Sequence, residues 1–208
     1  MRADRHDESR IRARRLRVAY EAARLIARHG LQDFHQAKMK AAAQLGILDD
    51  ASLPRNSEVQ AQLRDYQRLF QGEEQPRQLR VLRQAALEAM HFFERFEPRL
   101  VGSVLDGTAD AHSPVSLQVF NDDADAVARF VLEAGRPARL QERKLRVGKG
   151  LSASFPAWEF SVDGLAVEVV VLPTTLLRHA PLSAVDGKPM QRASLAAVTR
   201  LLADNADG

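Results

Sequence analysis

Hydrophobic residues recur at helical spacing along the first half of the chain, which predicts a run of helices there. Asp33 could cap a helix that Gly46 would end, and Asn56 or Ser57 could cap the next one. Pro76 suits the first turn of a fourth helix, where its missing N–H has no partner in any case. We therefore expect helices over residues 8–29, 34–46, 58–70 and from 76 onward.

The pattern changes at Pro98, after which β-branched residues alternate with polar ones as they do in half-buried strands. "RLVGS" (99–103) and "VSLQVF" (115–120) are the first two expected strands, and Asp163-Gly164 predicts a two-residue hairpin turn. The other expected elements are a helix over 123–135, a polar edge strand over 138–147, strands over 156–162 and 165–172, and helices over 174–180 and 192–204.

This order of elements predicts an α+β protein rather than one with regular alternation of strands and helices. We expect a boundary near residue 97. Residues 1–96 would form a helical region with a basic first helix. Residues 97–208 would form an α+β domain, in which helices pack on a small mixed β-sheet. Trp158 and Phe160 stand two apart in one strand, so they share a face and are expected in the core.

The composition narrows the class of protein. With 208 residues and 45% hydrophobic content, the chain can form one sizeable core, or a core with a helical appendage. It has no cysteine, which excludes disulfides and thiolate metal sites. The N-terminus is charged and resembles no secretory signal, and no apolar run is long enough to span a bilayer. We expect a cytoplasmic protein of bacterial type that does not act at a membrane.

A Gly-Ser pair ends the first expected strand, and a later apolar strand carries a single acid. These are Gly102-Ser103 in "RLVGS" and Glu168 in "LAVEVVVL". Over roughly residues 85–175, the arrangement resembles the nucleotidyltransferase superfamily, the polymerase-β-like fold. In that family a strand ends in Gly-Ser, a second strand carries Asp-hydrophobic-Asp, and a later strand carries a third carboxylate.

The resemblance implies a nucleotide site and a magnesium site. Glycine lets the backbone approach a triphosphate, and exposed amides and a serine hydroxyl can bind its oxygens. Glu168 matches the third carboxylate, so it would be the catalytic and metal-binding residue, with Mg²⁺ as the cofactor. The nucleotide-binding residues implied by the resemblance are Gly102, Ser103, Gly107, His112, Ser113 and Ser116.

The first two carboxylates of the family pattern are replaced. Carboxylates one residue apart point to the same side of a strand and can share a metal pair, but the chain has Pro114 and Ser116 there. Asp106 and Asp110 could contribute from the intervening loop without meeting the family's metal geometry. We therefore expect a nucleotidyltransferase-like protein that is catalytically impaired or inactive and binds a nucleotide or a partner protein.

Two alternatives stay open at this site. The protein could be an active, divergent magnesium-dependent enzyme that moves a nucleotidyl group to a protein, an RNA or a small acceptor. Alternatively Gly102 and Gly107 only form turns, and Ser113-Pro114 begins an edge strand, where proline is tolerated. Arg178, His179, Lys188 and Arg192 follow the strand of Glu168 and could either contact phosphates or lie in a solvated loop.

The basic first helix predicts another function, binding of RNA or DNA as a regulator. The cations concerned are Arg12, Arg14, Arg15 and Arg17. Residues 17–47 also resemble the opening of TetR-type regulators, where a helix-turn-helix contains "AAxxLGV". The resemblance ends at "ILDDASLP", because acidic residues at the start of a recognition helix would repel phosphate. The alternative is a helical bundle with a solvated basic face.

Overall fold

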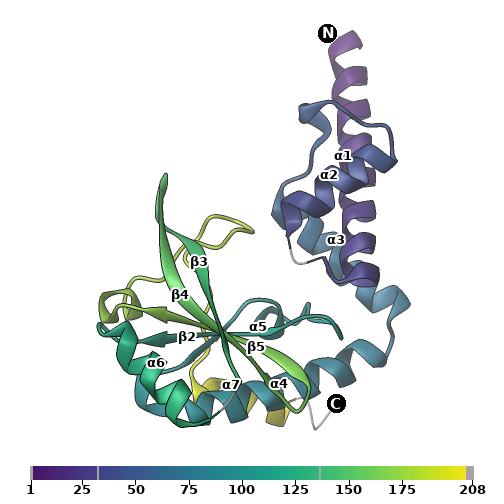
Figure 1. Ribbon diagram of the computed structural model, residues 1–208. Coiled ribbons are helices and arrows are strands. Elements are labelled where there is room, and N and C mark those ends of the chain that lie inside the picture. The colour runs from purple at the N-terminus through teal and green to yellow at the C-terminus, as the bar shows by residue number, and fades with distance from the viewer. Residues whose placement is uncertain (1, 32, 136, 205–208) are drawn as a thin grey trace. The chain divides into compact units, whose positions relative to one another are not determined.

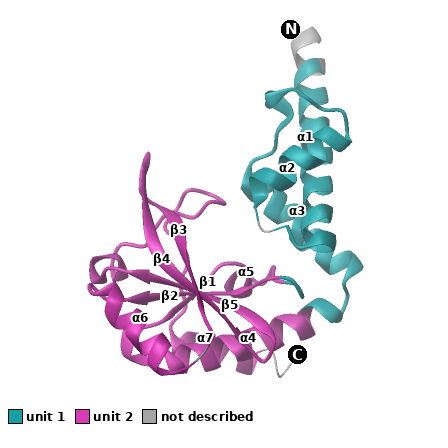
Figure 2. Ribbon diagram, viewed as in Figure 1, with its two compact units in different colours: residues 1–75, 110–112 teal, residues 76–109, 113–208 magenta. Residues whose placement is uncertain are grey.

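The computed structural model describes residues 2–31, 33–135 and 137–204, which divide into two compact units (Figure 2). Unit 1 contains the chain up to residue 75 together with residues 110–112. Unit 2 contains residues 76–109 and 113–208. No helix in the described ranges is both long and apolar enough to cross a membrane.

Unit 1 is built from three helices and a short 3-10 turn, with a core rich in alanine. Asp33 caps the second helix as expected, because its carboxylate accepts hydrogen bonds from the backbone of His35 and Gln36. The third helix begins at Asn56, so its N-cap residue is Arg55 rather than the expected Asn56 or Ser57. The elements are α1 (Arg2–His29), α2 (Phe34–Gln44), η1 (Asp50–Ser52) and α3 (Asn56–Phe70).

Unit 2 joins a long helix to a five-stranded sheet (Figure 1). The division between the units falls between Gln75 and Pro76, in the first turn of α4, and Leu82 and Met90 of α4 pack into the core of the sheet. The elements are α4 (Glu74–Phe92), η2 (Glu94–Phe96), β1 (Arg99–Val101), α5 (Ser103–Asp106), β2 (Val115–Phe120), α6 (Ala124–Glu133), β3 (Arg139–Gly148), β4 (Leu151–Val162), β5 (Leu165–Leu172), η3 (Thr174–Leu177) and α7 (Leu195–Asp204).

The sheet is mixed, with strand order β1-β2-β5-β4-β3. β2 pairs with β5 in parallel, and every other neighbouring pair is antiparallel. The expected α+β class and the mixed sheet packed by helices are therefore confirmed. β3 lies at an edge of the sheet, as its polar sequence predicted.

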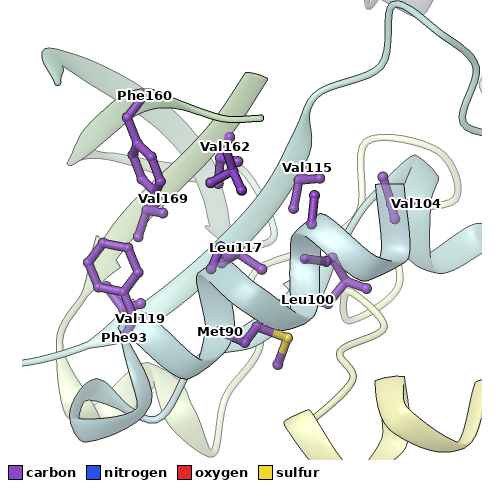
Figure 3. Packing of buried hydrophobic residues seen from close by; sticks show 14 of the residues in the cluster. Met90, Phe93, Leu100, Val104, Val115, Leu117, Val119, Phe160, Val162 and Val169 are labelled. Atoms are coloured by element: carbon purple, nitrogen blue, oxygen red, sulfur yellow. The ribbon is translucent and has the colours of Figure 1, made fainter. Parts of the chain in front are cut away.

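One face of the sheet holds the main core of unit 2. Figure 3 shows Met90 of α4 and Phe93, the residue after this helix, packed with Leu117 and Val119 of β2 and Val169 of β5. Trp158 and Phe160 belong to the same core, as expected, and α6 and α7 add Val127, Val131 and Val198. Alternate residues of the strands point to the other face, which carries Ser116, Glu159 and Glu168 together with a smaller apolar cluster of Phe120, Ala157, Val170 and Leu172.

Two elements differ from the sequence-based expectation. β4 begins at Leu151, five residues before the expected start at Pro156. At Pro156, β4 pairs with β3 alone, since its pairing with β5 begins at Ala157. A strand with one neighbour tolerates a proline, which lacks the N–H of a second ladder. The helix expected over 174–180 is the short 3-10 turn η3.

Candidate functional site

The Gly102-Ser103 pair forms the turn between β1 and α5. Gly102 has φ 73° and ψ −156°, a backbone conformation that favours glycine. The carbonyl of Ser103 accepts hydrogen bonds from the backbone N–H groups of Thr108 and Ala109, at 3.0 and 3.1 Å, which closes the loop around α5. A Cβ atom on Gly102 would lie 3.8 Å from Ser116 Cβ, so the turn lies directly beside the start of β2.

A buried arginine, Arg83, supports this turn and was not expected from the sequence. Arg83 comes from α4 and its Nε donates a hydrogen bond of 3.2 Å to the carbonyl of Val104 in α5. Burial lowers the pKa of the Arg83 guanidinium. Gly107 ends α5 at φ 78°, and its space is bounded by Arg83 and Leu79, each 3.9 Å from the position of an added Cβ. Gly107 thus has a structural role in the turn.

A row of side chains crosses the polar face of the sheet beside the Gly-Ser turn. Ser116 of β2 is level with Glu168 of β5, and Glu168 is level with Glu159 of β4. Residues paired across neighbouring strands have their side chains on the same face, so all three share it. Val101 of β1 is level with Ser116 and extends the row to the strand that ends in the turn.

Cationic and amide side chains from β3 hold the two acids of this row. Arg143 Nε lies 3.4 Å from Glu168 Oε1, and Gln141 donates a hydrogen bond of 2.6 Å to Glu159 Oε2. Burial raises the pKa of the Glu168 carboxyl; Arg143 opposes this shift and the nearby Glu159 carboxylate adds to it. Arg143 and Glu159 were not expected at the site, because their positions depend on the register between strands.

The donors around Glu168 do not fit a pair of magnesium ions. The family pattern needs carboxylates at Pro114 and Ser116, and neither residue supplies one. In the described part of the chain, no cluster of three or more His, Asp or Glu side chains could hold a metal ion. Glu168 is paired with Arg143 instead. We therefore derive no chemical step that passes through Mg²⁺.

The expected nucleotide-binding residues are divided between the two units. Gly102, Ser103, Gly107, Ser113 and Ser116 all belong to unit 2. Residues 110–112, including His112, are grouped with unit 1. The backbone N–H of His112 donates a hydrogen bond of 2.9 Å to the Asp110 carboxylate, which is the geometry of a hydrogen-bonded turn. Asp106 is the last residue of α5.

The Arg192 guanidinium binds backbone carbonyls within unit 2. Its Nη1 donates hydrogen bonds of 2.7 and 3.3 Å to the carbonyls of Leu176 and Leu177, and the group lies over the Phe120 ring at 5.1 Å from its centroid. Burial lowers the pKa of Arg192 to about 10, with a further contribution from the charge of Arg99. These contacts tie the segment before α7 to η3.

The basic first helix uses two of its four expected cations within unit 1. Arg14 pairs with Asp49 at 3.2 Å, and Arg15 donates a hydrogen bond of 2.6 Å to the carbonyl of Ala51. Arg12 and Arg17 are exposed. The acidic stretch after α2 thus binds α1, which gives "ILDDASLP" a structural role.

No protein-family model matches the chain, and no curated protein matches its sequence.

Proposed function

We propose that this protein is nucleotidyltransferase-like, binds a nucleotide through the Gly102-Ser103 turn, and is catalytically impaired or inactive. One observation carries the proposal. The turn ends β1 beside Ser116, and Ser116 is level with Glu168 on the neighbouring strand. The resemblance noted in the sequence implies this juxtaposition of the turn, the second strand and the third carboxylate.

The phosphate-binding part of the proposal rests on the backbone of the turn. Gly102 adds no side chain, so a phosphate group can approach the neighbouring amides closely. The Ser103 hydroxyl adds a further donor. Arg83 donates a hydrogen bond to the carbonyl of Val104 in α5. This contact keeps the turn in one conformation before any ligand binds.

The impaired part of the proposal rests on the acids. Two-metal catalysis needs several carboxylates that converge on the ions. Here Glu168 is partly buried, its pKa is raised by that burial, and its carboxylate pairs with Arg143. The Arg143 guanidinium already pairs with the carboxylate that would otherwise attract a metal cation. We therefore expect nucleotide binding at this turn without magnesium.

An active magnesium-dependent transferase is the second candidate, and the level pair of Glu159 and Glu168 is the feature that favours it. The Glu168→Gln substitution separates the two candidates. In a magnesium-dependent enzyme, magnesium raises the nucleotide affinity of the wild type, and this change abolishes that effect. In the impaired protein, magnesium changes the nucleotide affinity of neither the wild type nor the variant.

Replacing Gly102 with valine tests the site itself. A valine at φ 73° is strained and would place its methyl groups against Ser116. We expect nucleotide affinity, measured by calorimetric titration, to fall about tenfold or more, a change of about 1.4 kcal/mol. Gly135→Val is the control, because Gly135 also has a positive φ (63°) but has open space around it. Equal affinities in wild type and Gly102→Val would remove the site assignment.

A further inference from the structure

β3 and β4 continue beyond the rest of the sheet as a two-stranded ribbon. β4 pairs with β5 only over residues 157–162, whereas its first six residues, 151–156, pair with β3 alone. Figure 1 shows β3 and β4 extending past the other strands. Six residues in a strand span about 20 Å. We name residues 143–156 the basic ribbon.

The basic ribbon is strongly cationic. It carries Arg143, Lys144, Arg146 and Lys149, and residues 143–158 contain no aspartate or glutamate. Glu142 lies at the base of the ribbon. The loop at residues 182–189 pairs with β3 at Arg146 and contains one acid, Asp186. The Asp186 carboxylate accepts a hydrogen bond from the backbone N–H of Lys188 in the same turn.

The two faces of the ribbon differ in character. Lys144 is level with Ser154 and Arg146 with Ser152, so these four exposed side chains share one face. Leu145 and Phe155 point to the other face, where they pack against the smaller apolar cluster of unit 2. Arg143 points to that face too, toward Glu168. The face with Lys144 and Arg146 is therefore a surface of cations and hydroxyls.

One end of this surface is held in place. The backbone N–H of Leu182 donates a hydrogen bond of 2.7 Å to the carbonyl of Arg146, and Arg146 Nη2 donates one of 2.6 Å to the carbonyl of Ser183. Lys149 lies in the turn at the tip, beside Gly150 with φ 72°. The loop at residues 182–183 thus fixes the outer edge of β3 while the tip extends into solvent.

We infer that the basic ribbon binds double-stranded DNA, with Lys144, Arg146 and Lys149 on phosphates and Ser152 and Ser154 as further donors. The major groove of B-form DNA is about 12 Å wide and admits a two-stranded β-ribbon. Lysine, arginine and serine are the side chains that donate to phosphate oxygens. The inference concerns a surface separate from the Gly102-Ser103 turn and does not depend on nucleotide binding there.

The shape and composition of the ribbon select duplex DNA among polyanions. The deep, narrow major groove of A-form RNA does not admit such an element. Single strands are bound by stacking their bases on aromatic side chains. The polar face has none, because Phe155 points to the opposite face. The absence of acids over residues 143–158 distinguishes the ribbon from an ordinary solvated strand of mixed charge.

The salt dependence of DNA binding tests the inference in the full-length chain. Three phosphate contacts give a slope of about −2.7 in log affinity against log salt, or about 40-fold weaker binding between about 50 and 200 mM salt. Fluorescence anisotropy with a labelled duplex of mixed sequence measures this slope. The variant Lys144→Gln/Arg146→Gln/Lys149→Gln should bind less tightly, and the steepness of its slope should fall by about 2.7. In Lys144→Gln/Lys149→Gln, which keeps the contact of Arg146 with Ser183, the steepness should fall by about 1.8.

The matched control is Arg64→Gln/Arg80→Gln/Arg200→Gln, which removes the same charge from exposed positions on α3, α4 and α7. This control should keep the wild-type slope. Unlabelled single-stranded DNA and double-stranded RNA should compete more weakly than duplex DNA. The inference is overturned if duplex DNA does not bind, if the control loses as much affinity as the ribbon variants, or if either competitor is as effective as the duplex.

Discussion

At the scale of single residues, the polar row on the sheet is governed by the balance of charge around Glu168. Glu168 is level with Glu159 on one side and with Ser116 on the other. Two acids that face each other in a partly buried row repel one another unless a cation intervenes. Arg143 supplies that cation from β3, at 3.4 Å from the Glu168 carboxylate. Glu168 is thus paired with a cationic side chain of the protein, and the row does not form a metal site.

The substitution Glu168→Gln should change how stability depends on pH. The pKa of Glu168 is raised in the folded protein, chiefly by burial, so folding favours the protonated carboxyl. The wild type therefore loses stability as pH rises from the ordinary value of 4.5 through the raised folded pKa. The glutamine variant lacks this loss. Its stability relative to wild type should increase across that window and then level off.

Urea unfolding of unit 2 at a series of pH values measures this difference. Glu142→Gln is the control, because it removes one carboxyl from an exposed position on the same sheet. A stability difference between Glu168→Gln and wild type that stays constant or shrinks as pH rises would contradict the role given to burial.

At the scale of elements, local chemistry predicted most of the helices and strands. Asp163-Gly164 forms the expected hairpin turn with φ 49° and 82°, and the charged sequence of β3 marked it as an edge strand. The early start of β4 was missed because Pro156 suggests a strand boundary, and only the strand pairing shows that the ladder between β4 and β5 ends at Ala157. The site was predictable where it depends on a local motif, as at Gly102. Arg83 and Arg143 reach the site from distant elements, so no local pattern indicates them.

The cap of α2 gives a prediction at this scale. The Asp33 carboxylate accepts hydrogen bonds from the backbone N–H groups of His35 at 2.7 Å and Gln36 at 3.3 Å. Asp33→Ala should lower the free energy of unfolding of unit 1 by about 1 kcal/mol, as measured by denaturant titration. Asp33→Asn keeps an oxygen acceptor and should lose clearly less. Equal losses in the two variants would show that the cap does not stabilise the helix.

At the scale of the whole molecule, the chain contains separate hydrophobic cores. One core is formed by α1, α2 and α3 in unit 1, and unit 2 has the largest core on one face of its sheet and a smaller apolar cluster on the other. α4 joins the second unit because its apolar stripe matches the sheet. The sequence pattern identified the helix but not its partner, since an amphipathic stripe does not specify the surface that it covers.

Separate cores should unfold as separate transitions. Leu63 is 3% exposed in the core of unit 1, and Leu117 is fully buried in that of unit 2. Leu63→Ala should lower the stability of one calorimetric transition, and Leu117→Ala that of the other, each by about 2–5 kcal/mol. A single transition that both substitutions shift equally would show that the two units unfold as one.

The central claim, that a nucleotide binds at the Gly102-Ser103 turn without catalytic magnesium, has one direct measurement. The full-length protein is titrated calorimetrically with ATP, GTP, CTP and UTP, each with and without Mg²⁺. We predict that at least one nucleotide binds, with an affinity that Mg²⁺ does not change. Binding that requires Mg²⁺ would contradict the loss of the metal site, and no binding of any of the four would contradict the nucleotide site itself.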